Sequence, residues 1–149
     1  MKVRRPRRPR NFRPADSAQQ IVGGFLLAGP FVVTEEVWVL ARNMSILQAI
    51  GTISVVFLIG YGTLYKADTT RDQDEEQQVG GVPIRFISLM IVAFGSVTVL
   101  ALLFDAPETF LGSVDATDQM AIITFKAVSV GSIFSVVGAA TADSVFSRS

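Results

Sequence analysis

The sequence contains no cysteine and no histidine among its 149 residues. The chain therefore has no thiolate nucleophile, disulfide or imidazole base, and no side chains suited to haem or an iron–sulfur cluster. Carboxylates are the main metal ligands left, which disfavours a zinc site. Charge is also scarce, because 17% of the residues are charged against about 25% in an ordinary soluble domain. We expect no cofactor, and we expect that the protein is not an enzyme.

Long hydrophobic runs are abundant. Half of the residues are hydrophobic, and most of them gather into four apolar stretches. Each stretch is about 20 residues long, the length that a helix needs to cross roughly 30 Å of hydrocarbon. A soluble fold of this size would have too little polar surface to cover them. We therefore predict an all-α, polytopic membrane protein, in which residues 19–149 form a bundle of four transmembrane helices at about 19–41, 46–65, 84–104 and 120–142.

Two of these stretches allow another interpretation. The fourth contains Lys126 and can be drawn as an amphipathic helix on the membrane surface, but such a helix needs a charged face. Lys126 and Asp143 are the only charges available for it. The first stretch follows basic residues, as in a cleaved signal peptide, but Glu35 and Glu36 interrupt its end and no A-x-A cleavage site follows. A spanning helix is favoured in both cases.

The distribution of Lys and Arg predicts the orientation. Residues 1–13 carry seven of them, and the connection after the second helix adds Lys66, Arg71 and Arg85. The opposite side has Arg42 in its first loop. With four spans, both termini and the middle loop share the positive side, which is the cytoplasmic side by the positive-inside rule. We predict a multi-pass protein of the cell (plasma) membrane with cytoplasmic N- and C-termini.

Residues 1–18 are predicted to form a disordered basic arm. Prolines and repelling like charges in the first part of this segment oppose helix formation. Anionic lipid head groups, nucleic acid and an acidic protein are the candidate partners. No aromatic residue precedes Phe12, so nothing indicates stacking on bases. Basic residues near an anionic membrane contribute about 1 kcal/mol each. We therefore favour the lipid bilayer over nucleic acid, with head-group contacts from Arg4, Arg5, Arg7, Arg8 and Arg10.

The middle loop is acidic and faintly resembles a calcium-binding loop. Asp72 and Asp74 have the spacing with which such a loop begins. However, Gln77 stands where a calcium loop requires glycine at its sixth position. A solvated loop is the favoured interpretation, and no metal site is predicted.

Three ionisable residues fall inside the predicted spans: Glu35, Glu36 and Lys126. The first helix runs outward and the fourth inward, so all three lie at a similar depth near the outer end, and an ion pair between the helices is possible. Adjacent helical residues point about 100° apart, so only one of the two glutamates can face Lys126. The other could face a water-filled cavity, face another subunit, or be protonated. The structural alternative is that all three reach interfacial water, with Lys126 extended outward.

Two further patterns concern helix geometry. Pro30 removes a backbone hydrogen bond to Leu26, which predicts a kink just before the glutamates. The fourth helix repeats small residues every four positions, a spacing that lets two helices touch backbone to backbone. This ladder can pack within the chain or form a subunit interface, and we favour a homo-oligomer. Its members are Ala127, Gly131, Ser135 and Ala139.

The segment Gly23 to Ala41, GGFLLAGPFVVTEEVWVLA, resembles the opening of a prokaryotic family of integral membrane proteins of unknown function. The pattern is a small residue before Pro30, then acidic residues at Glu35 and Glu36, and then Trp38. The resemblance implies a membrane protein, but it implies no reaction and no ligand.

These observations favour an oligomeric channel or transporter-like protein with a polar path near Glu35, Glu36 and Lys126. The alternative is a non-transporting scaffold or accessory subunit that recruits partners through the basic arm and the acidic loop. A membrane enzyme ranks below both, because the chain lacks His, Cys and any metal motif.

Overall fold

The computed structural model describes residues 12–67, 78–112 and 116–147. Nearly all of this chain is helical, which confirms the predicted all-α class. A two-residue antiparallel hairpin, β1 (Gln78–Val79) with β2 (Val82–Pro83), precedes α4. The helices are α1 (Pro14–Val32), α2 (Glu35–Asn43), α3 (Ile46–Tyr61) with its π-helical extension η1 (Gly62–Ala67), α4 (Ile84–Leu103), α5 (Ala106–Leu111) and α6 (Thr117–Ser147).

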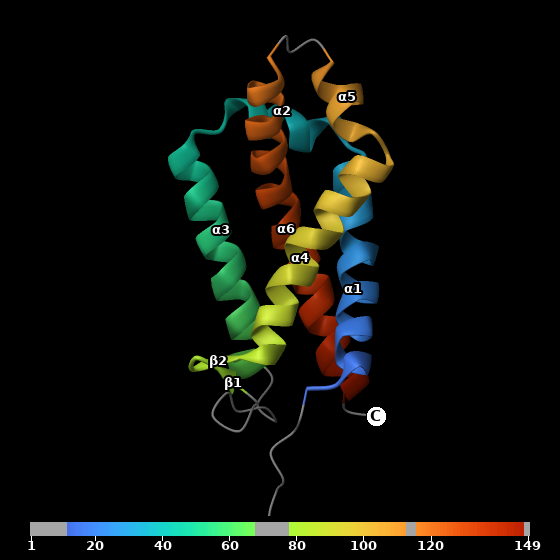
Figure 1. The fold of residues 1–149 in the computed structure, drawn as a ribbon, viewed down its shortest axis with the longest axis vertical. Helices are drawn as coiled ribbons and strands as arrows, with labels where there is room; N and C mark the ends of the chain where they lie inside the picture. Colours follow the sequence, from blue (N-terminus) through green and yellow to red (C-terminus); the bar gives the residue numbers. More distant parts are fainter. Residues whose placement is uncertain (1–11, 68–77, 113–115, 148–149) are drawn as a thin grey trace, which may run out of the picture.

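Four long helices run side by side along the molecule: α1, α3, α4 and α6 (Figure 1). The short helices α2 and α5 lie together at one end, which we call the cap. The hairpin, the start of α1 and the end of α6 lie at the other end, which we call the terminal end (Figure 1). Helix α6 is central, because it contacts α1, α2, α3 and α4.

Three segments are long and apolar enough to cross a membrane: Ile46–Tyr65, Ile84–Leu103 and Thr117–Phe146. Helices α1 and α2 pass the same test only as a pair, which is bent by 79°. The described chain therefore has three candidate spans, or four if the bent pair counts as one. A multi-pass integral membrane protein follows from either number.

The prediction of a single first helix at 19–41 is wrong. Helix α1 ends at Val32, and α2 begins at Glu35 after the extended N-cap residue Thr34. Pro30 lies inside α1, and its missing N–H weakens the last turn. The hydroxyl of Thr34 donates to the Phe31 carbonyl at 3.0 Å, and the Thr34 backbone N–H donates to the same oxygen at 3.4 Å, so this residue closes the last turn of the helix with two donors. The sharp bend thus follows Pro30 by two residues.

Two other boundaries also differ from the prediction. Helix α1 starts at Pro14, so residues 14–18 are helical rather than part of a disordered arm. Proline is suited to this first helical position, because its missing N–H needs no partner there. The fourth predicted helix is longer at both ends, from Thr117 to Ser147. Residues 1–11, with the arginines predicted to contact lipid, lie outside the described part of the chain.

Glycines bring α1 and α6 into contact at the centre of the molecule. A Cβ atom added to Gly23 would lie 2.1 Å from the Gly138 carbonyl oxygen, and one added to Gly138 would lie 2.3 Å from the Gly23 carbonyl oxygen. The Ser135 hydroxyl donates to the Gly24 carbonyl at 3.1 Å across the same contact. Such a close approach is possible only where both helices lack side chains.

The small-residue ladder of α6 is used inside the chain. Ala127, Ser135 and Ala139 are at most 3% exposed, and Gly131 is buried against Val97 of α4. Because the chain's own helices already cover these residues, the ladder cannot also form the subunit interface that the sequence suggested.

Candidate functional site

A cluster of buried polar side chains joins α1, α4 and α6 at the terminal end. Asp16, Arg85 and Asp143 come from these three helices and are at most 2% exposed. One guanidinium bridges both carboxylates: Arg85 Nη1 lies 2.6 Å from Asp143 Oδ1, and Arg85 Nη2 lies 3.3 Å from Asp16 Oδ2. Arginine suits this position because its planar fork can bond two carboxylates at once.

Neutral side chains extend the cluster. The Gln20 amide donates to Asp143 Oδ2 at 3.1 Å and to the Arg85 carbonyl at 3.3 Å. The amide oxygen of Gln20 accepts a hydrogen bond from the Ser88 hydroxyl at 2.7 Å. We call Asp16, Gln20, Arg85, Ser88 and Asp143 the charge cluster. Its hydrogen bonds cross between α1, α4 and α6, so it fixes the relative positions of these helices.

One oxygen of the cluster is less well satisfied. Asp16 Oδ2 accepts from the Arg13 backbone N–H at 2.9 Å and from Arg85. Asp16 Oδ1 is buried and has no hydrogen-bond donor in the described chain. Its ion-pair partner is Arg13, with Nη2 at 3.8 Å, and the Arg13 side chain is 67% exposed. Phe12 stacks on the Arg85 guanidinium, 5.4 Å from Cζ to the ring centroid. Phe12 and Arg13 therefore cover the cluster at the terminal end.

Helix ends explain why these residues meet. Asp16 lies in the first turn of α1, Arg85 is the second residue of α4, and Asp143 is in the last turns of α6. Asp16 and Gln20 are four residues apart and share one face of α1. This polar face also explains why α1 is not apolar enough to pass as a span by itself. Its polar residues face protein rather than lipid.

The structure separates the three residues that the sequence favoured. Glu35 and Glu36 are exposed in the first turn of α2, where negative charge suits the positive end of the helix dipole. The half-buried Lys126 donates to the Met44 carbonyl at 2.7 Å, next to the end of α2. No ion pair joins Lys126 to either glutamate within residues 12–67, 78–112 and 116–147. Glu35 and Glu36 belong to the cap, and Lys126 of α6 contacts the end of α2 there, so all three lie at the end opposite the charge cluster (Figure 1).

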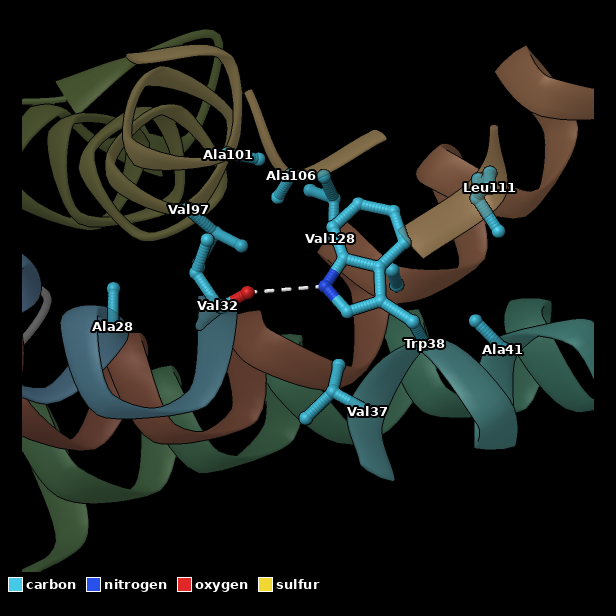
Figure 2. Packing of buried hydrophobic residues seen from close by; sticks show 11 residues of the cluster. Ala28, Val32, Val37, Trp38, Ala41, Val97, Ala101, Ala106, Leu111 and Val128 are labelled. Atoms are coloured by element: carbon cyan, nitrogen blue, oxygen red, sulfur yellow. Dashed lines mark hydrogen bonds between the residues drawn. The ribbon is translucent and has the colours of Figure 1, made fainter. Parts of the chain in front are cut away.

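Trp38 holds the bend between α1 and α2. Its ring is 2% exposed, and its indole N–H donates to the Val32 carbonyl at 3.0 Å (Figure 2). Val32 is the last residue of α1, so this bond satisfies a carbonyl that the broken helix leaves open. The indole also stacks on Phe110 of α5 at 5.8 Å between centroids, and Arg42 donates to the Phe110 carbonyl. Helix α2 is therefore joined to both α1 and α5.

We expect Trp38→Phe to destabilise the protein by about 1–3 kcal/mol, because a buried carbonyl loses its donor while most of the ring packing remains. Thermal unfolding in detergent, followed by far-ultraviolet circular dichroism, measures this loss. Trp38→Leu is the matched variant, and it should cost more because the contact with Phe110 is lost as well. A Trp38→Phe protein as stable as the wild type would show that the bend does not need this hydrogen bond.

A small cavity lies behind Trp38, but its lining is apolar. Val97, Ala101 and Val128 are among its walls, and it has room for about one water-sized sphere. An apolar cavity of this size stays dry. It therefore provides no polar path beside Glu35 and Glu36.

The described residues also contain no group of three or more His, Cys, Asp or Glu side chains that could hold a metal ion. The acidic residues 72–77, with the faint likeness to a calcium loop, lie outside the described chain. The same is true of most of the basic arm and acidic loop, on which the scaffold hypothesis depends.

Sequence reasoning missed the charge cluster. Asp16, Arg85 and Asp143 stand at or beyond the ends of the predicted spans, where charges are normally solvated. The useful signal was the spacing of Asp16 and Gln20, which places two polar residues on one face of a helix that is otherwise apolar.

The apolar helices, together with a polar cluster enclosed between them, define a polytopic integral membrane protein. The chain belongs to the family described as "Putative integral membrane protein (DUF2391)", which it matches over residues 5–145. This match confirms the resemblance noted in Gly23 to Ala41 and extends it over nearly the whole chain. No curated protein and no solved structure gives a match. The family description adds no reaction, ligand or partner.

Proposed function

We propose that this protein carries protons or small monovalent cations across the cell membrane, and that Asp16 in the charge cluster is the binding site. The observation that supports this proposal is the buried Asp16 Oδ1, which has no hydrogen-bond donor in the described chain. It replaces the polar path near Glu35, Glu36 and Lys126 that the sequence suggested.

The argument rests on the cost of a buried acceptor. An ionised carboxylate oxygen accepts hydrogen bonds but donates none, and burying it without a partner costs several kcal/mol (about 1–3 or more). The ion-pair partner of Asp16 Oδ1, the side chain of Arg13, is exposed and 3.8 Å away. An exposed arginine can withdraw into water at little cost. A proton or a small cation that replaces Arg13 there would satisfy the same oxygen.

The proposed topology has four spans. The 19 residues of α1 rise about 28 Å at 1.5 Å per residue, close to the roughly 30 Å thickness of the hydrocarbon. The polar start of α1 is buried against α4 and α6, so it is not exposed to lipid. We assign the terminal end to the cytoplasm, because the basic segment 1–13 leads directly into α1, which starts at this end, and Arg85 lies there as well. In that orientation the arm reaches anionic head groups, and the cap faces outward. We still predict a homo-oligomer, but its interface would have to be formed by residues other than the α6 ladder.

Flux in proteoliposomes tests this function. We expect wild-type vesicles to conduct protons, Na⁺ or K⁺ down an imposed gradient, and Asp16→Asn to lower the rate by about tenfold or more. The matched controls are Glu35→Gln and Glu36→Gln, exposed acids at the other end, which should leave flux unchanged. Arg13→Gln should alter the rate without affecting the fold, because this side chain is 67% exposed.

Melting temperatures of all variants in detergent separate a lost site from a lost fold. The proposal is wrong if wild-type vesicles carry none of the three ions, or if a folded Asp16→Asn protein conducts like the wild type. If Glu35→Gln or Glu36→Gln loses ion flux while Asp16→Asn conducts like the wild type, the ion-binding site lies in the cap instead.

A further inference from the structure

Buried hydroxyl groups lie along α6 between the charge cluster and the cap. Ser129, Ser132 and Ser135 are 0% exposed, and Ser96 of the adjacent α4 is 2% exposed. We call these four residues the hydroxyl column. No charge lies on α6 between Lys126 and Asp143, so these serines are the polar groups of its middle part.

The column and the charged residues beyond its two ends, Asp143 and Lys126, together cover most of the membrane thickness. Along α6 the rise from Asp143 to Lys126 is roughly 25 Å at 1.5 Å per residue, against about 30 Å of hydrocarbon. Ser135, Ser132 and Ser129 follow one another at three-residue steps, each a rise of about 4.5 Å. At the end nearest the cap, the Lys126 ammonium is half-buried and donates to the Met44 carbonyl.

The α1 helix bridges the gap between Asp143 and Ser135. Gln20, which donates to Asp143, lies one turn below Gly24 on α1. The Gly24 carbonyl accepts from the Ser135 hydroxyl at 3.1 Å. A Cβ atom on Gly24 would lie 3.0 Å from Ser96 Oγ and 3.2 Å from Ser135 Oγ, so two hydroxyls from different helices flank this glycine. A series of polar groups thus connects the charge cluster to the column across the contact of α1 with α6.

Ser96 distinguishes the column from ordinary packing. Ser129 and Ser132 donate to carbonyls four residues earlier, Phe125 and Val128, which is how helices commonly satisfy buried serines. Ser96 Oγ makes no such bond and has no partner within the described chain, although it is buried. A hydroxyl at this depth normally finds a partner, so Ser96 is a group available for transfer.

We propose that the hydroxyl column is the route by which protons pass between the charge cluster and Lys126. This inference rests on the proposed function and specifies its ion. A serine hydroxyl can accept a proton on a lone pair and release its own to the next acceptor. An ammonium has no lone pair, so Lys126 must first release a proton to water at the cap and can then accept the proton that arrives from the column. The route favours protons over metal cations, because a metal cation needs several oxygen ligands at once. The Ser129 and Ser132 hydroxyls are already bonded to carbonyls of their own helix, and the Lys126 ammonium at the end of the route repels a cation.

The test compares serine-to-alanine variants in proton flux and stability. We expect Ser96→Ala and Ser132→Ala to lower proton flux by about tenfold or more, with melting temperatures close to wild type. Ser132→Thr keeps a hydroxyl and should recover most of the rate. The matched control is Ser54→Ala, because Ser54 donates to the Ile50 carbonyl in the same way but is exposed on α3.

Each outcome decides between the two proposals. If Asp16→Asn abolishes proton flux while the double variant Ser96→Ala/Ser132→Ala conducts like the wild type, the route is wrong and the site stands. If Ser54→Ala loses as much flux as Ser132→Ala, the effect is not specific to the column, and the route is again wrong. If the vesicles carry Na⁺ or K⁺ but no protons, the column is overturned even though the carrier function holds. If Asp16→Asn has no effect, the proposed function itself fails.

Discussion

Replacing Arg85 by leucine is expected to lower the free energy of unfolding by about 3–5 kcal/mol, because the change leaves two buried carboxylates without their shared cation. Asp16 and Asp143 are at most 1% exposed, so water cannot replace the guanidinium without opening the contact of three helices. The bond from Arg85 to Asp143, at 2.6 Å, is the shorter of the two. Chemical or thermal unfolding in detergent micelles measures the loss.

The control variants separate a lost partner from a lost side chain. Arg85→Leu combined with Asp143→Leu should recover part of the stability, because removing both members of a buried pair leaves fewer unpaired charges than removing one. Arg13→Leu removes a cation that also contacts Asp16, but its side chain is 67% exposed, so we expect a change below about 1 kcal/mol. If Arg85→Leu is as mild as Arg13→Leu, the cluster does not hold the helices together.

The apolar helices were predictable from the sequence for a simple physical reason. Lipid offers no hydrogen bonds, so a chain that crosses it must satisfy its backbone within a helix. The predicted spans at about 46–65 and 84–104 therefore agree closely with Ile46–Tyr65 and Ile84–Leu103. Here a local pattern determines the local structure, and distant residues add little.

The break in the first helix was not predictable to the same degree. Pro30 indicated a kink, but the position and size of the bend depend on groups that proline alone does not identify. Trp38 satisfies the carbonyl at the end of α1, and Lys126, far along the chain, satisfies one at the end of α2. A helix break inside an apolar protein requires such partners, and they become known only when the helices are packed.

The charge cluster shows the same limit more strongly. The three charged residues of the cluster, Asp16, Arg85 and Asp143, lie near the ends of apolar stretches. At such positions the sequence does not distinguish a solvated charge from a buried one. Their burial depends on each other: 69 residues separate Arg85 from Asp16, and 58 separate it from Asp143. Glu35 and Glu36, which the pattern placed inside a span, are exposed because the break turns α2 away from α1. Both errors have one cause, which is that sequence position alone does not fix depth at a helix end.

Gly138→Ala is expected to destabilise the protein by about 1–3 kcal/mol or more. The added methyl group would lie 2.3 Å from the Gly23 carbonyl oxygen, a distance that only a shift of α1 away from α6 can relieve. That shift would also lengthen the bond from Ser135 to the Gly24 carbonyl, now 3.1 Å. A backbone atom cannot rotate out of the way as a flexible side chain can, so the whole α1–α6 contact has to adjust.

Gly95→Ala is the matched control for this substitution. Gly95 lies in the interior of α4, and a Cβ atom there meets nothing within 4 Å. Alanine should therefore stabilise that helix slightly, by up to about 1 kcal/mol, through its better helix propensity. Opposite signs in the two melting temperatures would show that the contact, rather than glycine content, sets the stability. A Gly138→Ala protein that melts with Gly95→Ala would contradict the close crossing of α1 and α6, and with it the passage from the charge cluster to the hydroxyl column.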